Sequence, residues 1–143
     1  MTVVGHQIKY MKITAKINQF TYPILIGDNV LNKLPNEISK FTKSKKVLFL
    51  LDSHLSKSYK KFFKKIFTKH KFSPSFIKIK AGKKCKTINN LLKIINYLEE
   101  KKFSKDSTLV VLGGGTIGDL GGFAASIFYR GMNMVSLPTT LTA

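Results

Sequence analysis

Cysteine is almost absent from this sequence, and tryptophan is wholly absent. The only cysteine among the 143 residues is Cys85, which excludes an internal disulfide and any zinc site built from several cysteines. Such cysteine usage fits a reducing compartment, and we expect a cytoplasmic location. Proline is also scarce, at four residues, and no repeat or low-complexity segment interrupts the chain, so an ordinary globular protein is expected.

Long apolar runs are missing as well. No stretch approaches the roughly 20 apolar residues that a membrane-spanning helix needs, and the start of the chain lacks the apolar core of a signal peptide. We therefore expect no membrane partner. Residues 1–10 are predicted to be an N-terminal overhang, and residues 11–143 are predicted to form one domain with a real hydrophobic core.

Acidic side chains are few, and the net charge is strongly positive. The chain has seven Asp and Glu residues but 24 Lys and one Arg, which gives a formal net charge of +18. This excess favours anionic ligands by electrostatic steering and permits salt-sensitive, non-specific binding of polyanions. Specific recognition of nucleic acid usually relies on arginine forks within a known binding motif, so we expect no specific nucleic-acid partner.

The apolar pattern predicts several strands. Alternating apolar residues over 11–17 and 20–24 favour an antiparallel strand pair that turns near Asn18. Further strands are predicted at residues 47–51, 75–80, 109–112 and 133–137.

The apolar pattern predicts helices between these strands. An amphipathic helix is predicted near residues 59–70, with aromatic side chains on one side and lysines on the other. Such a helix can lie on an anionic membrane, but between two strands it is more simply a helix that covers a sheet. Thr87 is predicted to cap a further helix. The alternation favours an α/β fold with a mostly parallel sheet and helices on both faces, preceded by the antiparallel pair.

A glycine-rich turn follows the predicted strand 109–112. Its glycines let the backbone approach a ligand closely, and the free amides at the start of the next helix attract an anion. The spacing Gly113-x-Gly115-x-x-Gly118 satisfies the dinucleotide fingerprint, although no acidic residue follows Asp119 at the usual distance of about 20 positions. The alternative is a turn that only lets a helix pack closely on a sheet. The spacing alone leaves both interpretations open.

Two other places carry candidate ligand-binding side chains. Asp52, Ser53 and His54 follow the predicted strand 47–51, at the edge where open parallel sheets bind ligands. Arg130 is the only arginine, and its guanidinium fork suits a carboxylate or a phosphate. The alternative role of Arg130 is that of a cation at a helix C-terminus.

Residues 113–143, GGGTIGDLGGFAASIFYRGMNMVSLPTTLTA, closely resemble a segment of the 3-dehydroquinate synthase family, one of the sugar phosphate cyclases. Weaker similarity through YPILIG, VLFLLD and the turn before Thr87 extends the resemblance over most of residues 11–143. It implies the Rossmann-like, NAD-binding N-terminal half of these enzymes. The helical domain that holds a divalent metal, zinc or cobalt, is expected to lie outside this chain, and the complete enzyme is expected to be a homodimer.

The resemblance also implies site residues. Arg130 resembles the family's substrate-contacting arginine, and Asp52 would supply the ribose-binding acid that is missing after Asp119. The residues implied to contact NAD are Gly114, Gly115, Thr116, Ile117, Gly118, Asp119, Thr139 and Thr140 around the glycine turn, Asp52, Ser53 and His54 near the adenosine ribose, and Lys83 and Lys86 in the turn before Thr87.

One position departs from the family pattern. The family usually has Gly-Glu-x-x-Lys before the third helix, whereas this chain has Gly82-Lys83-Lys84-Cys85-Lys86. An ammonium only donates hydrogen bonds, so Lys83 cannot replace a carboxylate that accepts one from a ribose hydroxyl.

The implied activity is that of a carbon–oxygen lyase of aromatic amino acid biosynthesis. In the shikimate pathway it converts 3-deoxy-D-arabino-heptulosonate 7-phosphate, an anionic sugar-acid phosphate, to 3-dehydroquinate and phosphate. We expect this chain alone to be inactive, because the family's metal ligands and substrate-binding lysines are expected beyond it. Another sugar phosphate cyclase, a metal-dependent polyol dehydrogenase, or a non-catalytic lysine-rich module that binds polyanions are the alternatives.

Overall fold

The structure is a computed structural model that describes residues 10–55 and 57–141. Apart from Tyr10, the predicted overhang lies outside the described residues. In chain order the elements are β1 (Met11–Ile17), β2 (Phe20–Ile26), α1 (Val30–Ser39), β3 (Lys46–Asp52), α2 (Lys57–Lys69), β4 (Ser73–Ile79), η1 (Lys83–Cys85), α3 (Ile88–Glu100), β5 (Thr108–Gly113), α4 (Gly115–Ile127), η2 (Phe128–Arg130) and β6 (Asn133–Pro138).

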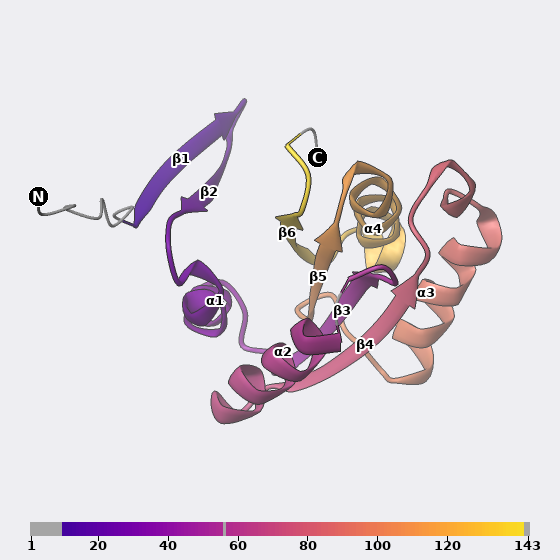
Figure 1. The fold of residues 1–143 in the computed structure, drawn as a ribbon, viewed down its shortest axis with the longest axis horizontal. Helices are drawn as coiled ribbons and strands as arrows, with labels where there is room; N and C mark the ends of the chain where they lie inside the picture. The colour runs from indigo at the N-terminus through magenta and orange to yellow at the C-terminus, as the bar shows by residue number, and fades with distance from the viewer. Residues whose placement is uncertain (1–9, 56, 142–143) are drawn as a thin grey trace, which may run out of the picture.

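Strands β3 to β6 form a parallel sheet in the order β4-β3-β5-β6 (Figure 1). Strand β5 lies in the interior of the sheet and is buried along its whole length, because helices cover both faces. That environment explains its unbroken apolar run, LVVL, in place of an alternating pattern. The predicted α/β fold with a mostly parallel sheet is confirmed.

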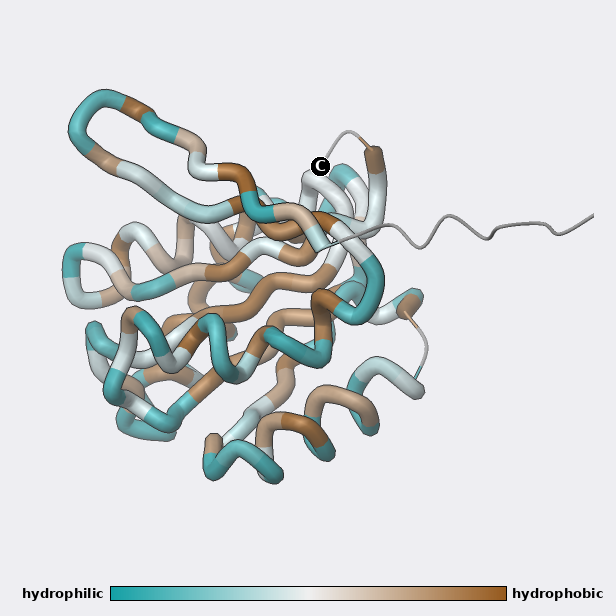
Figure 2. Tube along the Cα trace, turned by 90° about the vertical axis from the view of Figure 1, so that its left-hand side faces the viewer, coloured by the Kyte–Doolittle hydropathy of each residue, from teal (hydrophilic) through white to brown (hydrophobic). Residues whose placement is uncertain are grey.

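The two faces of the sheet are packed by different pairs of helices. On one face, Leu48 and Leu50 of β3 share a core with residues of α3 and α4. On the other face, Val47 and Phe49 share a core with residues of α1 and α2. Figure 2 shows the hydrophobic strands at the centre, with hydrophilic residues gathered toward the outside of the surrounding helices. Helices therefore cover both faces, as predicted.

Helix α2 has the amphipathic structure that its periodicity predicts. Phe63 and Phe67 are fully buried, and their rings lie 4.7 Å and 4.9 Å from the ring of Phe49 on β3. Aromatic pairs at these separations contribute packing energy beyond the area they bury. The helix is therefore a sheet-covering element with a lysine-rich outer face. Among the described residues, no helix is long and apolar enough to cross a membrane.

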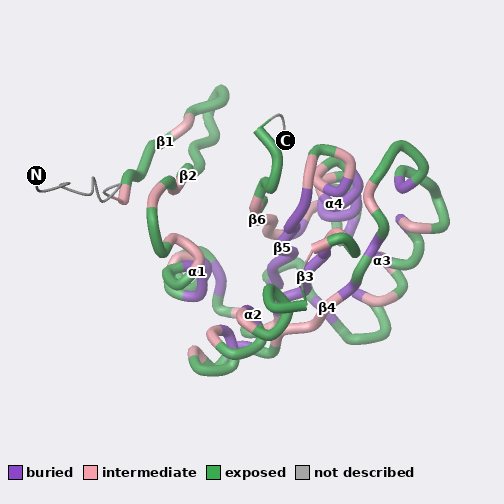
Figure 3. Tube along the Cα trace, viewed as in Figure 1, coloured by how far each residue is buried: buried purple, intermediate pink, exposed green. Residues whose placement is uncertain are grey.

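The antiparallel pair β1–β2 projects away from the sheet (Figure 1). It turns at residues 18–19, as predicted, with Ile17 opposite Phe20. Most of its residues are exposed, including the large apolar side chains of Ile17 and Phe20 (Figure 3). The pair therefore contributes little to the buried core of this chain.

Helix α4 approaches the sheet unusually closely, and Gly121 permits this contact. A Cβ atom at Gly121 would lie 2.5 Å from Cγ2 of Val111 and 3.2 Å from Cδ2 of Leu50. Both neighbours are buried in the core, so neither has room to move aside. At the next position the situation differs, because a Cβ at Gly122 would come no closer than 3.8 Å to Met134.

We predict that Gly121→Ala lowers the free energy of unfolding by about 1–3 kcal/mol, because the added methyl group overpacks the contact between α4 and β5. The matched control, Gly122→Ala, adds the same methyl group to the same helix. It is expected to leave stability unchanged or to raise it by up to about 1 kcal/mol through helix propensity. Urea denaturation followed by circular dichroism measures both. Equal destabilisation of the two variants would contradict this account of the packing.

Candidate functional site

The glycine turn (residues 113–118) joins the end of β5 to the start of α4. Gly114 occupies the N-cap position, and its carbonyl accepts hydrogen bonds from the amides of Ile117 (3.1 Å) and Gly118 (3.0 Å). The amides of Gly115 and Thr116 lie in the first turn of the helix, where no carbonyl of the same helix can accept their hydrogen bonds. They lie at the positive end of the helix dipole, at the carboxyl edge of the sheet. This arrangement suits a phosphate or another anion.

The glycine turn and the C-terminal Pro-Thr-Thr segment lie together. The amide of Thr139 donates to the carbonyl of Gly113 at 3.0 Å, which extends the β5–β6 pairing beyond the strands. A Cβ at Gly114 would lie only 3.2 Å from Cγ2 of Thr140. A Cβ at Gly118 would instead meet nothing within 4 Å, so the first turn of α4 has open space on that side. Thr139 and Thr140 thus border the turn, as the resemblance implies.

Asp52 ends the neighbouring strand β3, and its carboxylate organises the loop that follows. Oδ1 accepts hydrogen bonds from the amide of His54 (3.0 Å), from His54 Nδ1 (2.9 Å) and from the amide of Ala81 (3.4 Å). His54 must carry its proton on Nδ1 to donate to a carboxylate. The Asp52 side chain is largely buried whereas that of His54 is exposed. The carboxylate is therefore fixed at the same edge of the sheet as the glycine turn.

The surroundings of Asp52 favour its charged form. Burial raises the pKa of this carboxyl group, but the hydrogen bonds from His54 and Ala81 outweigh burial and hold the pKa below its ordinary value. An ionised carboxylate can accept a hydrogen bond from a sugar hydroxyl.

Residues 81–86, which contain η1, link Asp52 to the glycine turn. Ala81 donates to Asp52, and the amide of Gly82 donates to Oγ1 of Thr116 at 3.4 Å. The thiol of Cys85 is buried and lies 3.6 Å from the carbonyl of Thr116. These contacts place the turn before Thr87 beside the start of α4. The predicted cap of α3 is also confirmed, because Thr87 Oγ1 accepts from the amide of Asn90 at 3.2 Å.

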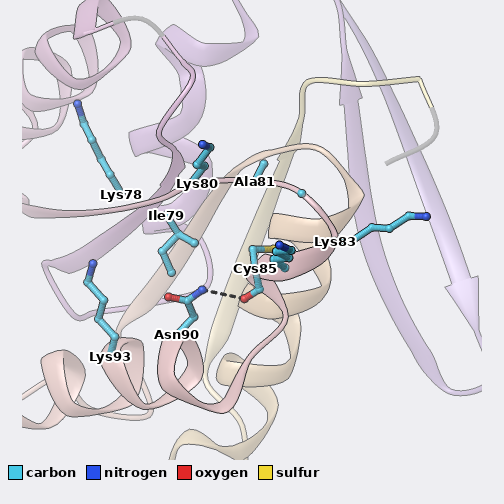
Figure 4. A pocket seen from close by; sticks show the side chains of 10 residues that line it. Lys78, Ile79, Lys80, Ala81, Lys83, Cys85, Asn90 and Lys93 are labelled. Atoms are coloured by element: carbon cyan, nitrogen blue, oxygen red, sulfur yellow. Dashed lines mark hydrogen bonds between the residues drawn. The ribbon is translucent and has the colours of Figure 1, made fainter.

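The two lysines assigned to this turn have different surroundings. Lys86 pairs with Asp119 on the first turns of α4, with 2.5 Å between Nζ and Oδ2. Both side chains are at least half exposed, so the pair contributes little stability, although it joins the turn to the helix. Lys83 is exposed, and its side chain points away from Asn90 and Lys93 of α3 (Figure 4).

Arg130 lies far from the other predicted site residues. It follows α4, whose 13 residues span about 20 Å, and it precedes β6 at the edge where the parallel strands begin. Tyr129 and Arg130 both have left-handed backbone angles, with φ of 47° and 61°, and both are exposed. Within one chain, helix α4 thus separates Arg130 from the glycine turn.

The other predicted site residues meet at the carboxyl edge of the sheet. Sequence reasoning missed the backbone amides of Ala81 and Gly82, which hold Asp52 and Thr116. The signal for them was their place directly after a strand that neighbours β3. The sequence also predicted no role for Cys85, which packs against Thr116. Among the described residues, no group of three or more His, Cys, Asp or Glu side chains could hold a metal ion.

Comparison with known sequences identifies the relatives of this chain. A family profile described as 3-dehydroquinate synthase N-terminal matches residues 76–143, the part that contains the glycine turn. The 3-dehydroquinate synthase of Clostridium botulinum (strain Alaska E43 / Type E3) is 36% identical over 132 residues, which cover 92% of this chain and 38% of the relative. This chain is similar to the amino-terminal part of 3-dehydroquinate synthase.

The predicted resemblance is thereby confirmed. The 3-dehydroquinate synthase of Prochlorococcus marinus (strain MIT 9211) is 35% identical over 135 residues, which cover 93% of this chain and 36% of the relative. The chain thus spans little more than a third of the length of these relatives.

Solved structures show the same fold. A 2-deoxy-scyllo-inosose synthase complexed with carbaglucose-6-phosphate, NAD+ and Co2+ matches with a TM-score of 0.80 at 20% identity, over 91% of this chain and 35% of that one. The 2-epi-5-epi-valiolone synthase of Streptomyces hygroscopicus subsp. jinggangensis 5008, with NAD+ and Zn2+ bound, matches with a TM-score of 0.72 at 18% identity, over 89% and 35% of the two chains. At these identities the matches establish the fold class, a Rossmann-like sheet.

We predict that Asp52→Asn lowers the free energy of unfolding by about 1–2 kcal/mol at neutral pH, because an amide accepts the His54 and Ala81 hydrogen bonds more weakly than a carboxylate. The folded pKa of Asp52 lies below its unfolded value of about 3.9, so this stabilisation is present above that pH and is lost as pH falls through the folded pKa.

Urea titrations at a series of pH values test this prediction. The stability difference between the two proteins should narrow below about pH 4. Asp28→Asn, which removes a carboxylate from an exposed turn, is the charge-matched control and should change stability little. A difference between Asp52→Asn and the original chain that persists unchanged at low pH would contradict the role given to the carboxylate.

Proposed function

We propose that this chain binds NAD at the glycine turn and forms the NAD-binding part of a 3-dehydroquinate synthase. That enzyme converts 3-deoxy-D-arabino-heptulosonate 7-phosphate to 3-dehydroquinate and phosphate. The observation that carries the proposal is the free start of α4 at the carboxyl edge of the sheet, beside the carboxylate of Asp52. The similarity to 3-dehydroquinate synthases over more than nine-tenths of the chain supports it.

The residues at this edge fit a dinucleotide. The amides of Gly115 and Thr116 would donate to the pyrophosphate, and the open space beside Gly118 leaves room for it. Asp52 would accept a hydrogen bond from an adenosine ribose hydroxyl, since its low pKa keeps it charged. Its neighbour strand β5 carries the glycine turn, which is the relation between ribose acid and glycine turn found in dinucleotide-binding sheets. When bound, NAD supplies reversible hydride transfer.

Three of the assigned residues receive narrower roles. Asp119 and Lys86 are paired with each other, so we propose that they hold the 81–86 turn against α4 near the dinucleotide. Lys83 would add a donor beside the adenosine ribose where the family usually has an acceptor. The contact of Arg130 with substrate stays a prediction, because helix α4 lies between it and the proposed NAD site.

We place the zinc or cobalt of the complete enzyme, and the ligands that hold it, outside these 143 residues. A bound divalent metal acts as a Lewis acid on a substrate oxygen. The residues of this chain would orient NAD and, with their positive charge, attract the anionic substrate. The homodimer and the cytoplasmic location stay predictions.

We predict that Gly114→Ala weakens NAD binding at least tenfold, because the added methyl group meets Thr140 and narrows the approach to the amides of Gly115 and Thr116. Gly122→Ala, two turns further along α4, is the matched control and should bind like the original chain. Calorimetric titration with NAD measures both, beside a salt series with duplex DNA. Steeply salt-dependent binding of DNA with no saturable binding of NAD would favour the polyanion-binding module instead.

A second prediction concerns turnover. This chain with NAD and zinc is expected to release no phosphate from 3-deoxy-D-arabino-heptulosonate 7-phosphate, because no metal-binding cluster lies among its described residues. A colorimetric phosphate assay against a blank without protein measures this, and a complete 3-dehydroquinate synthase serves as the positive control. Turnover clearly above the blank would show that the chain is catalytic by itself.

A further inference from the structure

One face of the β1–β2 pair is apolar along its whole length. Successive side chains of a strand point to opposite faces, and the register sets apolar residues directly opposite one another, as in Ile13 with Ile24 and Ile17 with Phe20. We call this the hairpin face; it consists of every second residue of β1 from Met11 and of β2 from Phe20. It contains no charged side chain, because the two lysines of β1 lie on the other face.

The hairpin face is open to solvent. Its seven large apolar side chains are between 39% and 67% exposed. Among the described residues, neither core of the sheet includes a side chain from β1 or β2 (Figure 3). A two-stranded hairpin is at best marginally stable by itself in water, so a surface that covers this face would stabilise the pair.

The area of the hairpin face is large enough for a contact between proteins. Seven large side chains that are each about half exposed present on the order of 600 Å² of apolar surface. This area lies at the upper end of the apolar patches on ordinary monomers. It approaches the roughly 800 Å² that each partner contributes to a standard interface.

The distribution of charge indicates which partner fits. An acidic partner would find no lysine to pair with on the hairpin face, so the matching surface must itself be apolar. The net charge of +18 makes two copies of the chain repel each other through most of their surface, but not through this uncharged face. The pair also projects from the sheet, with the lysine-rich helix α2 away from its tip (Figure 1). Contact between two hairpins therefore leaves the lysines of α2 outside the interface.

We propose that the hairpin face forms an interface between two copies of this chain, in which the two faces pack against each other about a two-fold axis. A two-fold contact uses the same patch on both subunits, so the patch must be complementary to itself. An apolar face without charge meets that condition. The proposal does not depend on NAD binding at the glycine turn.

The test is sedimentation equilibrium of the 143-residue chain over a concentration series. The site variant is Ile13→Thr with Ile24→Thr, because threonine keeps the strand propensity and an opposed threonine pair suits a hairpin. The control is Leu92→Gln with Ile127→Gln, which removes two large apolar side chains of similar exposure, 47% and 46%, from α3 and α4.

We expect a monomer–dimer equilibrium in the micromolar range for the original chain and the control, which is the weak end for interfaces of standard size. The site variant should dimerise at least tenfold more weakly. Raising the salt concentration to about 0.5 M should strengthen the dimer, because salt screens the repulsion between the two positively charged copies.

Hydrogen exchange of the original chain tests the same interface without a substitution, and it decides the matter if the site variant does not fold. The amides of β1 and β2 should exchange more slowly at high than at low protein concentration, because dimerisation stabilises the pair.

Four outcomes would overturn the proposal. The first is a chain that stays monomeric throughout the micromolar range. The second is association that the control weakens as much as the site variant does, which would place the contact elsewhere. The third is association that continues past the dimer, since a two-fold contact closes. The fourth is association that weakens in higher salt, as expected if a polyanion bridges the copies.

Discussion

The close contact between helix α4 and strand β5 is the constraint on which the candidate site depends. Because Gly121 has no side chain, the helix lies directly against Val111 and Leu50. Strand β5 ends at Gly113, and α4 begins at Gly115. The amides of Gly115 and Thr116 therefore lie at the carboxyl edge of the sheet, next to the end of the buried strand β5. A bulkier residue at this contact would move the whole helix, and with it the proposed anion-binding end.

The 81–86 turn fixes two side chains at that edge of the sheet, those of Asp52 and Thr116. Its backbone holds Asp52 through Ala81 and Thr116 through Gly82, so an acid from β3 and the start of α4 are positioned by one short segment. The ion pair between Lys86 and Asp119 adds a third link of lower energy.

Periodicity and turn chemistry predicted most of the fold. The alternation in β1 and β2, the buried run of β5, the amphipathic pattern of α2 and the cap at Thr87 each depend on local sequence, and each has its predicted structure. The glycine spacing was ambiguous because close packing and ligand approach both favour glycine. The residue that permits the closest packing is Gly121, which lies outside that spacing, whereas a Cβ at Gly118 would meet nothing within 4 Å. The distance of Arg130 from the turn follows from the predicted parallel sheet, because a helix that joins two parallel strands runs back to the edge where the second strand begins. The contacts that the 81–86 turn makes with Asp52 and Thr116 could not be predicted, because they depend on the conformation of a loop.

The central claim is that NAD binds at the start of α4, and amide NMR tests it most directly. Spectra of the isotopically labelled chain at physiological ionic strength, with increasing NAD, should show the largest shifts at Gly114, Gly115 and Thr116. The amide of His54 beside Asp52 should move with the same saturation curve. Glycine-turn amides that do not respond, while lysine-rich segments shift weakly and lose that response in higher salt, would contradict the account.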